Sequence, residues 1–264
     1  MRSNIRFLQV ANVLGFLAVI IMNVLSEVLP VNGVTTADIS GRYENLFTPA
    51  GFTFSIWSVI YLALLGFVIY QSKGLFQKGL NQSKTIVAQL GLVFLISCIA
   101  NIFWLYAWHY QEFTITIILM ALLLLSLIDL NRRIFSMQKS IDKTRQFTWF
   151  VKIPFGLYLG WICVATIANV AVLLKSEDWQ QLGISEHAWA IIMVFVAGLI
   201  GLMLLIKWRL VSAAAVIAWG IFGILYKNMS GDVDLILNVV MVVMIIVLMI
   251  GIVSFGINKK NVED

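Results

Sequence analysis

Residues 235–257, LILNVVMVVMIIVLMIGIVSFGI, form a run without a charged side chain. A bilayer core about 30 Å thick requires about 20 apolar residues in a helix, and this run is long enough. Comparable apolar runs precede it near residues 7–29, 51–71, 86–108, 113–131, 150–174, 188–206 and 210–226. Transmembrane strands would appear as alternating segments of about 10 residues, which these runs are not. The sequence therefore predicts an all-α, polytopic membrane bundle of about eight transmembrane helices.

The composition of the whole chain agrees with this prediction. Of 264 residues, 61% are hydrophobic and 12% are charged, and the mean hydropathy is +0.96. Soluble domains are typically about half apolar and carry about twice this share of charged residues. We therefore expect the lipid bilayer to be the main environment of the protein.

The basic residues predict how the helices are oriented. Lys and Arg accumulate in the short cytoplasmic loops of membrane proteins. Of the 18 Lys and Arg residues, all but Arg42, Lys175 and Lys227 fall on one side of the predicted spans. The chain is therefore expected in the cell membrane with both termini in the cytoplasm. The net charge of +5 follows from this asymmetry, so no nucleic-acid partner is expected.

The nine tryptophans fall into two groups. Tryptophans near the ends of spans commonly form an interfacial belt, and we assign five to it: Trp108, Trp149, Trp179, Trp189 and Trp208. An indole N–H deeper in the membrane needs a polar partner, so the others are expected to face the bundle interior or a cavity. These are Trp57, Trp104, Trp161 and Trp219.

Two asparagines within spans accompany these deeper tryptophans. Asn101 stands three residues before Trp104 and Asn169 eight residues after Trp161, which places amide and indole on roughly one helical face. Interhelical hydrogen bonding is the usual role of an Asn in a span. The alternative is a pocket with aromatic walls and amide edges, suited to a flat, apolar ligand.

Other reactive side chains give no catalytic or metal-binding motif. Cys98 and Cys163 fall in mid-span, where a buried apolar role is usual. His109 and His187 fall at the outer boundary, where we expect solvated loop residues. Without a buried carboxylate pair or nucleotide motif, we expect no catalytic residue, no metal and no cofactor, and nothing indicates an ion-coupled pump.

Three segments resemble the TspO/MBR family of tryptophan-rich sensory proteins, related to the translocator protein or peripheral benzodiazepine receptor. Residues 47–61, FTPAGFTFSIWSVIY, are similar to the segment that enters the family's second helix, with Phe47 and Ala50 in place of a Trp and a Pro. Residues 100–104, ANIFW, and 161–169, WICVATIAN, resemble blocks of its third and fifth helices. The family's fifth helix usually has a proline four residues before the tryptophan, whereas Pro154 precedes Trp161 by seven.

The resemblance covers residues 1–175 as a five-helix domain and leaves 176–264 as a C-terminal three-helix extension. It implies a pocket that opens toward the loop between the first two helices and that, in the family, binds porphyrins and other flat hydrophobic molecules. The residues of this chain that the resemblance and the aromatic–amide pattern assign to the pocket are Trp57, Tyr61, Asn101, Trp104, Trp161, Ala165 and Asn169. The aromatic outer loop, residues 31–50, fits either a lid over this pocket or an ordinary loop.

The resulting hypothesis is an integral membrane ligand-binding or sensory protein, with a tetrapyrrole such as a porphyrin as ligand rather than as cofactor. Two alternatives stay open: a transporter or permease for a hydrophobic small molecule, and an enzyme that degrades tetrapyrroles. Gly198 and Gly201 would permit close helix contact, and the sequence leaves open whether the protein is a homodimer.

Overall fold

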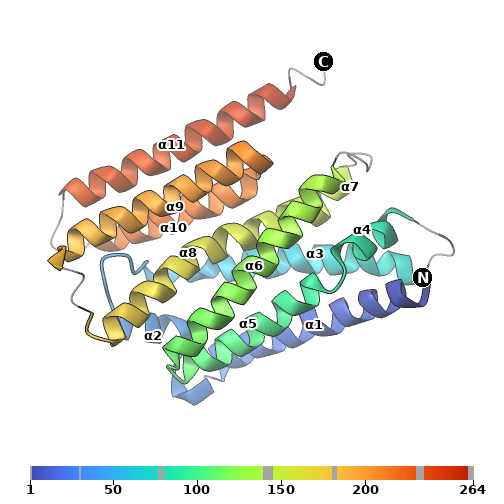
Figure 1. Ribbon diagram of the computed structural model, residues 1–264, viewed down its shortest axis with the longest axis horizontal. Coiled ribbons are helices and arrows are strands. Elements are labelled where there is room, and N and C mark those ends of the chain that lie inside the picture. Colours follow the sequence, from blue (N-terminus) through green and yellow to red (C-terminus); the bar gives the residue numbers. More distant parts are fainter. Residues whose placement is uncertain are drawn as a thin grey trace. The chain divides into compact units, whose positions relative to one another are not determined.

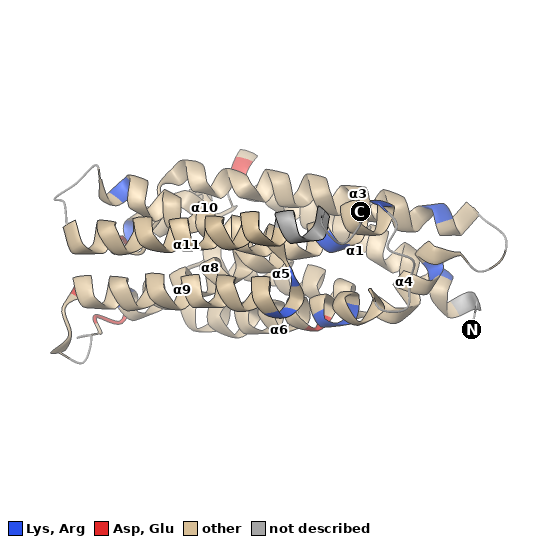
Figure 2. Ribbon diagram, turned by 90° about the horizontal axis from the view of Figure 1, so that it is seen from above, with Lys and Arg blue, Asp and Glu red and all other residues tan. Residues whose placement is uncertain are grey.

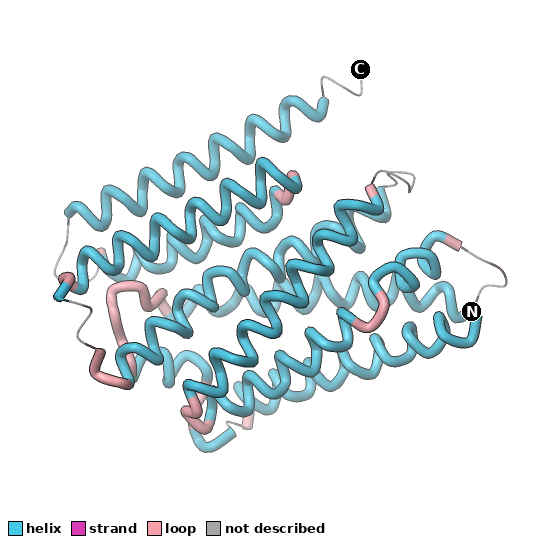
Figure 3. Tube along the Cα trace, viewed as in Figure 1, coloured by secondary structure: helices cyan, strands magenta, loops and turns pink. Residues whose placement is uncertain are grey.

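The computed structural model describes residues 2–29, 31–76, 79, 81–138, 145–179, 183–229 and 235–260. These residues form helices and connecting loops and include no strand (Figure 3). The all-α prediction is therefore confirmed. Charged residues gather toward the ends of the helices, whereas long stretches of helix carry none (Figure 2).

Seven helical segments within the described residues are long and apolar enough to cross a membrane. An eighth candidate is a bent pair, α4 (Gln82–Leu90) and α5 (Val93–His109). The seven segments comprise α1 (Arg2–Val28), η2 with α3 (Gly51–Ser55 and Ile56–Phe76), α6 (Phe113–Met137), α7 to α8 (Arg145–Phe147 to Ile153–Ser176), α9 (Glu186–Trp208), α10 (Val211–Asn228) and α11 (Leu235–Lys260). The protein is a polytopic helical bundle, as predicted, with seven or eight candidate spans in the part of the chain that the structure describes.

The span expected at 86–108 is not one straight helix. Its two parts are bent by 59° at Gly91, which has φ of +61° and ψ of −139°. Glycine adopts such a conformation without the steric cost of a Cβ atom. The Gly91 N–H donates to the Val87 carbonyl at 3.0 Å and closes α4. A window of apolar residues cannot show this break, because hydropathy does not depend on backbone direction.

The segment that leads into α8 contains a π-helical turn just before Pro154. Thr148–Lys152 forms a π-helical turn, in which the Ile153 N–H donates to the Thr148 carbonyl. Pro154 follows as the second residue of α8. Proline has no N–H to donate to the preceding turn, and a π-helical turn is a place where the regular helical hydrogen bonding is already interrupted. The helix thus enters the span through a widened turn.

The chain divides into two compact units, which are described separately. The first unit comprises Met1–Thr36 and Trp57–Leu159, and the second comprises Ala37–Ile56 and Gly160–Asp264. This division by compactness places α8 partly in each unit. The boundary expected after residue 175 between a family domain and an extension stays a prediction.

In the first unit, α5 packs against α1 and α6 (Figure 1). Its core includes the fully buried rings of Phe67, Phe94 and Phe155, whose centroids are 4.9–5.5 Å apart in edge-on contacts. Edge-on aromatic pairs stabilise beyond the area they bury. These contacts bring α3, α5 and the first turns of α8 together.

Polar side chains also connect α1 and α3 within the first unit. The Asn12 Nδ2 donates to the Gln71 Oε1 at 3.0 Å, and the Gln71 Nε2 donates to the Gln9 carbonyl at 3.0 Å. The Gln9 Nε2 in turn donates to the Gln71 carbonyl at 2.6 Å. All three side chains are buried. This network is the interhelical bonding that is usual for amides in spans.

In the second unit, α9, α10 and α11 lie side by side (Figure 1). Small residues allow the close approach: a Cβ atom on Gly198 would overlap the Met244 side chain, and one on Gly201 would lie 2.9 Å from the Leu248 Cδ2. The close helix contact expected at these two glycines is therefore made inside the chain. A Cβ on Gly160 of α8 would lie 2.5 Å from the backbone oxygen of Ala213 in α10.

Candidate functional site

Four of the predicted pocket residues belong to the first unit: Trp57, Tyr61, Asn101 and Trp104. Trp57 and Tyr61 lie one turn apart on α3, with rings stacked at a centroid distance of 5.3 Å and an angle of 14°. The Trp57 ring lies 6.4 Å from that of Trp104 on α5. It also meets the ring of Tyr158 on α8 edge-on at 6.0 Å. We call Trp57, Tyr61, Trp104 and Tyr158 the aromatic cluster.

An amide lies at the edge of the aromatic cluster. Asn101, which is fully buried, donates through Nδ2 to the Tyr158 hydroxyl at 2.9 Å. The Asn23 Nδ2 donates to the Asn101 Oδ1 at 3.5 Å. The cluster therefore combines aromatic faces with a polar edge.

Tyr158 was missed by the sequence reasoning. It is a tyrosine in the middle of a predicted span, and its hydroxyl needs a buried partner there. The indole N–H groups of the deeper tryptophans have the same requirement. It could therefore have identified Tyr158 from the sequence as well.

Trp108 and His109 correct two predictions. Trp108 does not belong to an interfacial belt: it is 4% exposed, stacks on Trp104 at 5.6 Å and donates through Nε1 to the Thr36 carbonyl at 3.3 Å. His109 is fully buried rather than solvated, and its Nδ1 lies 2.7 Å from the Leu105 carbonyl. Both residues are covered because the chain after α1 lies over this end of α5, as the hydrogen bond from the Asn32 Nδ2 to the His109 carbonyl shows.

The other three predicted pocket residues belong to the second unit. Trp161 and Asn169 are buried and Ala165 is half-buried. The Trp161 ring meets that of Phe54 edge-on at 6.0 Å, so a tryptophan of one resemblance block contacts a residue of another. The common pocket for all seven residues stays a prediction.

Helix α10 is hydrogen-bonded to the segment 44–54, which contains the first part of the first resemblance block. The Ala50 N–H donates to the Gly223 carbonyl at 3.0 Å, and the Trp219 Nε1 donates to the Thr53 carbonyl at 3.2 Å. The Asn228 Nδ2 donates to the Leu46 carbonyl at 3.0 Å. Trp219 thus has the polar partner that its deep position required. The last three helices are structurally joined to this segment.

Aromatic and ionic contacts add to this attachment. Phe52 meets Trp219 and Tyr226 edge-on, at 5.6 and 5.2 Å. Lys227 and Glu44 form an ion pair of 2.9 Å. An exposed ion pair contributes little stability, so the backbone and indole hydrogen bonds fix the segment more strongly.

Hydrogen bonds within the segment 44–54 also fix its backbone around Thr48. The Thr48 N–H donates to the Asn45 carbonyl at 2.9 Å, and the Thr48 Oγ1 accepts from the Asn45 N–H at 3.0 Å. The Asn45 Oδ1 accepts from the Phe47 N–H at 2.9 Å. Such side-chain bonds are typical of Asx and Ser/Thr turns. They define the turn that precedes Pro49.

Comparison with known protein families shows to which family the chain belongs. Residues 9–254 match the family model described as TSPO-like protein. The chain belongs to the TSPO-like family. The matched residues include α9, α10 and most of α11 as well as the helices before them. Neither the comparison with curated proteins nor that with solved structures gave a match.

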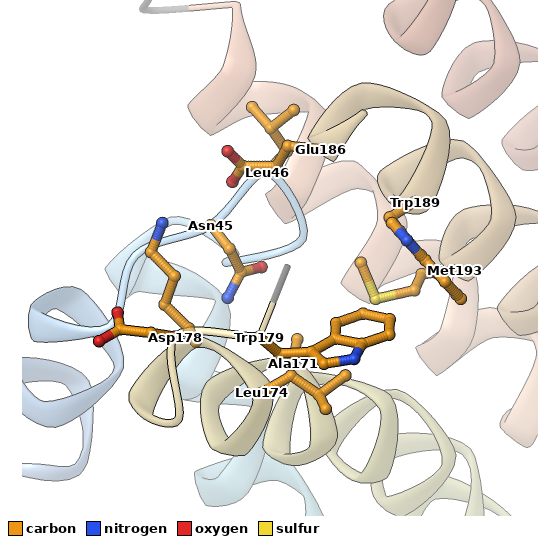
Figure 4. Close-up of a pocket in the computed structure, with 10 residues that line it drawn as sticks. Asn45, Leu46, Ala171, Leu174, Asp178, Trp179, Glu186, Trp189 and Met193 are labelled. Carbon is orange, nitrogen blue, oxygen red and sulfur yellow. The ribbon is translucent and has the colours of Figure 1, made fainter. Parts of the chain in front are cut away.

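A cavity of about 290 Å³ lies within the second unit of this TSPO-like membrane protein. Its lining comes from the loop after α2 (Thr36–Arg42), the end of α8 and the start of α9: Asn45, Leu46, Ala171, Leu174, Lys175, Asp178, Trp179, Glu186, Trp189 and Met193 (Figure 4). None of the seven predicted pocket residues is among them. Among the described residues, no group of three His, Cys, Asp or Glu side chains could hold a metal ion.

Proposed function

We propose that this TSPO-like membrane protein binds a porphyrin or a similar flat hydrophobic molecule, as a ligand-binding or sensory protein of the cell membrane. The observation that carries the proposal is the aromatic cluster with Asn101 at its edge. Family membership supports the same class of ligand, because the resemblance blocks contain Trp57, Tyr61, Asn101 and Trp104.

The chemistry of the cluster suits such a ligand. Aromatic rings stack on a flat conjugated molecule, and the area buried supplies most of the affinity. Buried amides and hydroxyls then fix the orientation, because a mismatched ligand would leave them without a partner. Asn101, Asn23 and Tyr158 already share hydrogen bonds, so a ligand with polar edges would exchange one set of partners for another. Trp161, Ala165 and Asn169 enter the proposal from the family resemblance.

The test is a titration of the detergent-solubilised full chain with protoporphyrin IX, followed by quenching of tryptophan fluorescence. We expect saturable quenching in the wild type and an affinity about tenfold weaker in Trp57→Leu, since a lost stacking contact is worth about 1–1.5 kcal/mol. Trp161→Phe tests the contribution of the second unit in the same way.

Trp149→Leu is the matched control. Trp149 is 56% exposed and lies in the π-helical turn, so its loss should leave the porphyrin affinity unchanged. Equal affinity of the wild type and Trp57→Leu would remove the aromatic cluster from the site. Quenching that rises linearly without saturation would reject a specific porphyrin site altogether.

The orientation of the protein is part of the same proposal. The distribution of basic residues supports cytoplasmic termini, and an even number of spans, with the bent pair counted as one, is consistent with both termini on one side.

A further inference from the structure

The cavity of the second unit contains an aromatic corner. The indole rings of Trp179 and Trp189 have centroids 5.1 Å apart and are inclined by 59°, so two aromatic faces border one space. Met193 and Leu174 lie near them and complete an apolar wall (Figure 4). Faces of Trp rings attract cations through the ring quadrupole, and inclined aromatic faces form the cages that hold quaternary ammonium groups.

The charged side chains of the lining favour a cation as well. Asp178 and Glu186 are carboxylates, and Lys175 is the one basic residue among the ten lining residues. The lining therefore carries one more negative than positive charge. The C-terminal end of α8 adds partial negative charge, while Glu186 in the first turn of α9 offsets the opposite dipole there.

The backbone fixes both sides of the aromatic corner. Asp178 has φ of +49°, a left-handed conformation that ends α8 and that Asp tolerates better than most residues. The Trp179 N–H then donates to the Leu174 carbonyl at 3.1 Å. On the other side, the Ser185 Oγ caps α9 by accepting from the Ala188 N–H at 3.3 Å, and the Trp189 N–H donates to the Ser185 carbonyl at 3.1 Å. Both tryptophans are thus attached to defined helix ends.

We propose that this cavity is a second ligand site, which binds an organic ammonium group against the faces of Trp179 and Trp189, at the corner that the two rings form, with Asp178 and Glu186 as counter-charges. The site is independent of the porphyrin proposal, because it shares no residue with the aromatic cluster. A cavity of about 290 Å³ is at the small end of ligand sites and suits a compact head group rather than a tetrapyrrole.

Two sources supply this chemistry: a soluble quaternary amine, and the choline head group of a phospholipid. For the lipid, Lys175 would face the phosphate. Tryptophans at the ends of spans commonly lie at the level of the head groups, so both sources can reach the cavity.

The probe for the test is choline, observed by saturation-transfer NMR of its methyl protons with the full chain in phosphatidylglycerol nanodiscs. We expect saturable binding that weakens about fivefold or more in Trp179→Leu and in Glu186→Gln. The neutral isostere of choline, in which carbon replaces the quaternary nitrogen, should not compete. Trp149→Leu and Glu177→Gln are the matched controls, since neither residue lines the cavity, and both should bind choline like the wild type.

Repeating the titration in phosphatidylcholine nanodiscs distinguishes the two sources. Loss of choline binding there would show that the lipid head group occupies the site, and unchanged binding would assign it to soluble amines. The proposal is overturned if both cavity variants bind choline as the wild type does, or if the neutral isostere competes equally well.

Discussion

Gly223 of α10 and Ala50 of the segment 44–54 are joined by a backbone hydrogen bond of 3.0 Å, although they are far apart in the sequence. Beside this bond, a Cβ atom on Gly223 would lie 2.7 Å from the Thr53 Cγ2 and 2.9 Å from its Cβ. The contact therefore requires glycine for space. Residues that resemble the family's second-helix entry are thus positioned by a helix of the last three.

Gly223→Ala should destabilise the second unit by about 1–3 kcal/mol, because the added methyl group must displace Thr53. Thermal unfolding in detergent measures the effect. Gly41→Ala is the control, since nothing lies within 4 Å of a Cβ at the exposed Gly41. In the double variant Gly223→Ala with Thr53→Ala, part of the loss should be recovered, and strictly additive losses would contradict the assigned contact.

Gly160→Ala should cost more stability than Gly198→Ala. The new Cβ at 160 would meet the backbone of Ala213 at 2.5–3.0 Å, whereas that at 198 would meet the end of the Met244 side chain. Methionine has several rotatable bonds and can move aside, but helix backbone cannot. Denaturation of both variants in the same detergent gives the order. An equal or reversed order would show that α8 and α10 can separate at little cost.

Gln71→Leu should destabilise the first unit by about 1–2 kcal/mol. The change removes the acceptor of Asn12 and the donor to the Gln9 carbonyl, and buried polar groups without partners are costly even where membrane hydrogen bonds are individually weak. Gln89→Leu, on an exposed side chain, is the matched control for the loss of an amide. Similar unfolding temperatures for both variants would argue against the network.

Single cysteines test the orientation. Cys98 and Cys163, which are 4% and 7% exposed, would first be replaced by Ala. In intact cells, a membrane-impermeant maleimide should then label Gly41→Cys but not Ser136→Cys, because these exposed positions lie on opposite sides of the predicted spans. A permeant maleimide should label both. Labelling of Ser136→Cys alone would invert the predicted topology.

The candidate site was partly predictable from the sequence. The spacing of Asn101 and Trp104 predicts amide and indole on one helical face, because residues three apart on a helix share a face, and both side chains are buried on α5. The requirement of a deep indole for a partner correctly anticipated the bond of Trp219, but not that this partner is the Thr53 carbonyl. Helical periodicity says which residues share a face and not which distant segment covers it.

The positions of the membrane spans were determined by the sequence alone, since the cost of placing a segment in hydrocarbon depends on the composition of about 20 consecutive residues. The tertiary structure decided which side chains face protein. Trp108 and His109 are buried by the chain after α1, and Trp179 and Trp189 line a cavity instead of only marking an interface. Lipid and protein interior are equally apolar, so hydropathy cannot distinguish a lipid-facing surface from a packed one. Only the contacts between distant segments make that distinction.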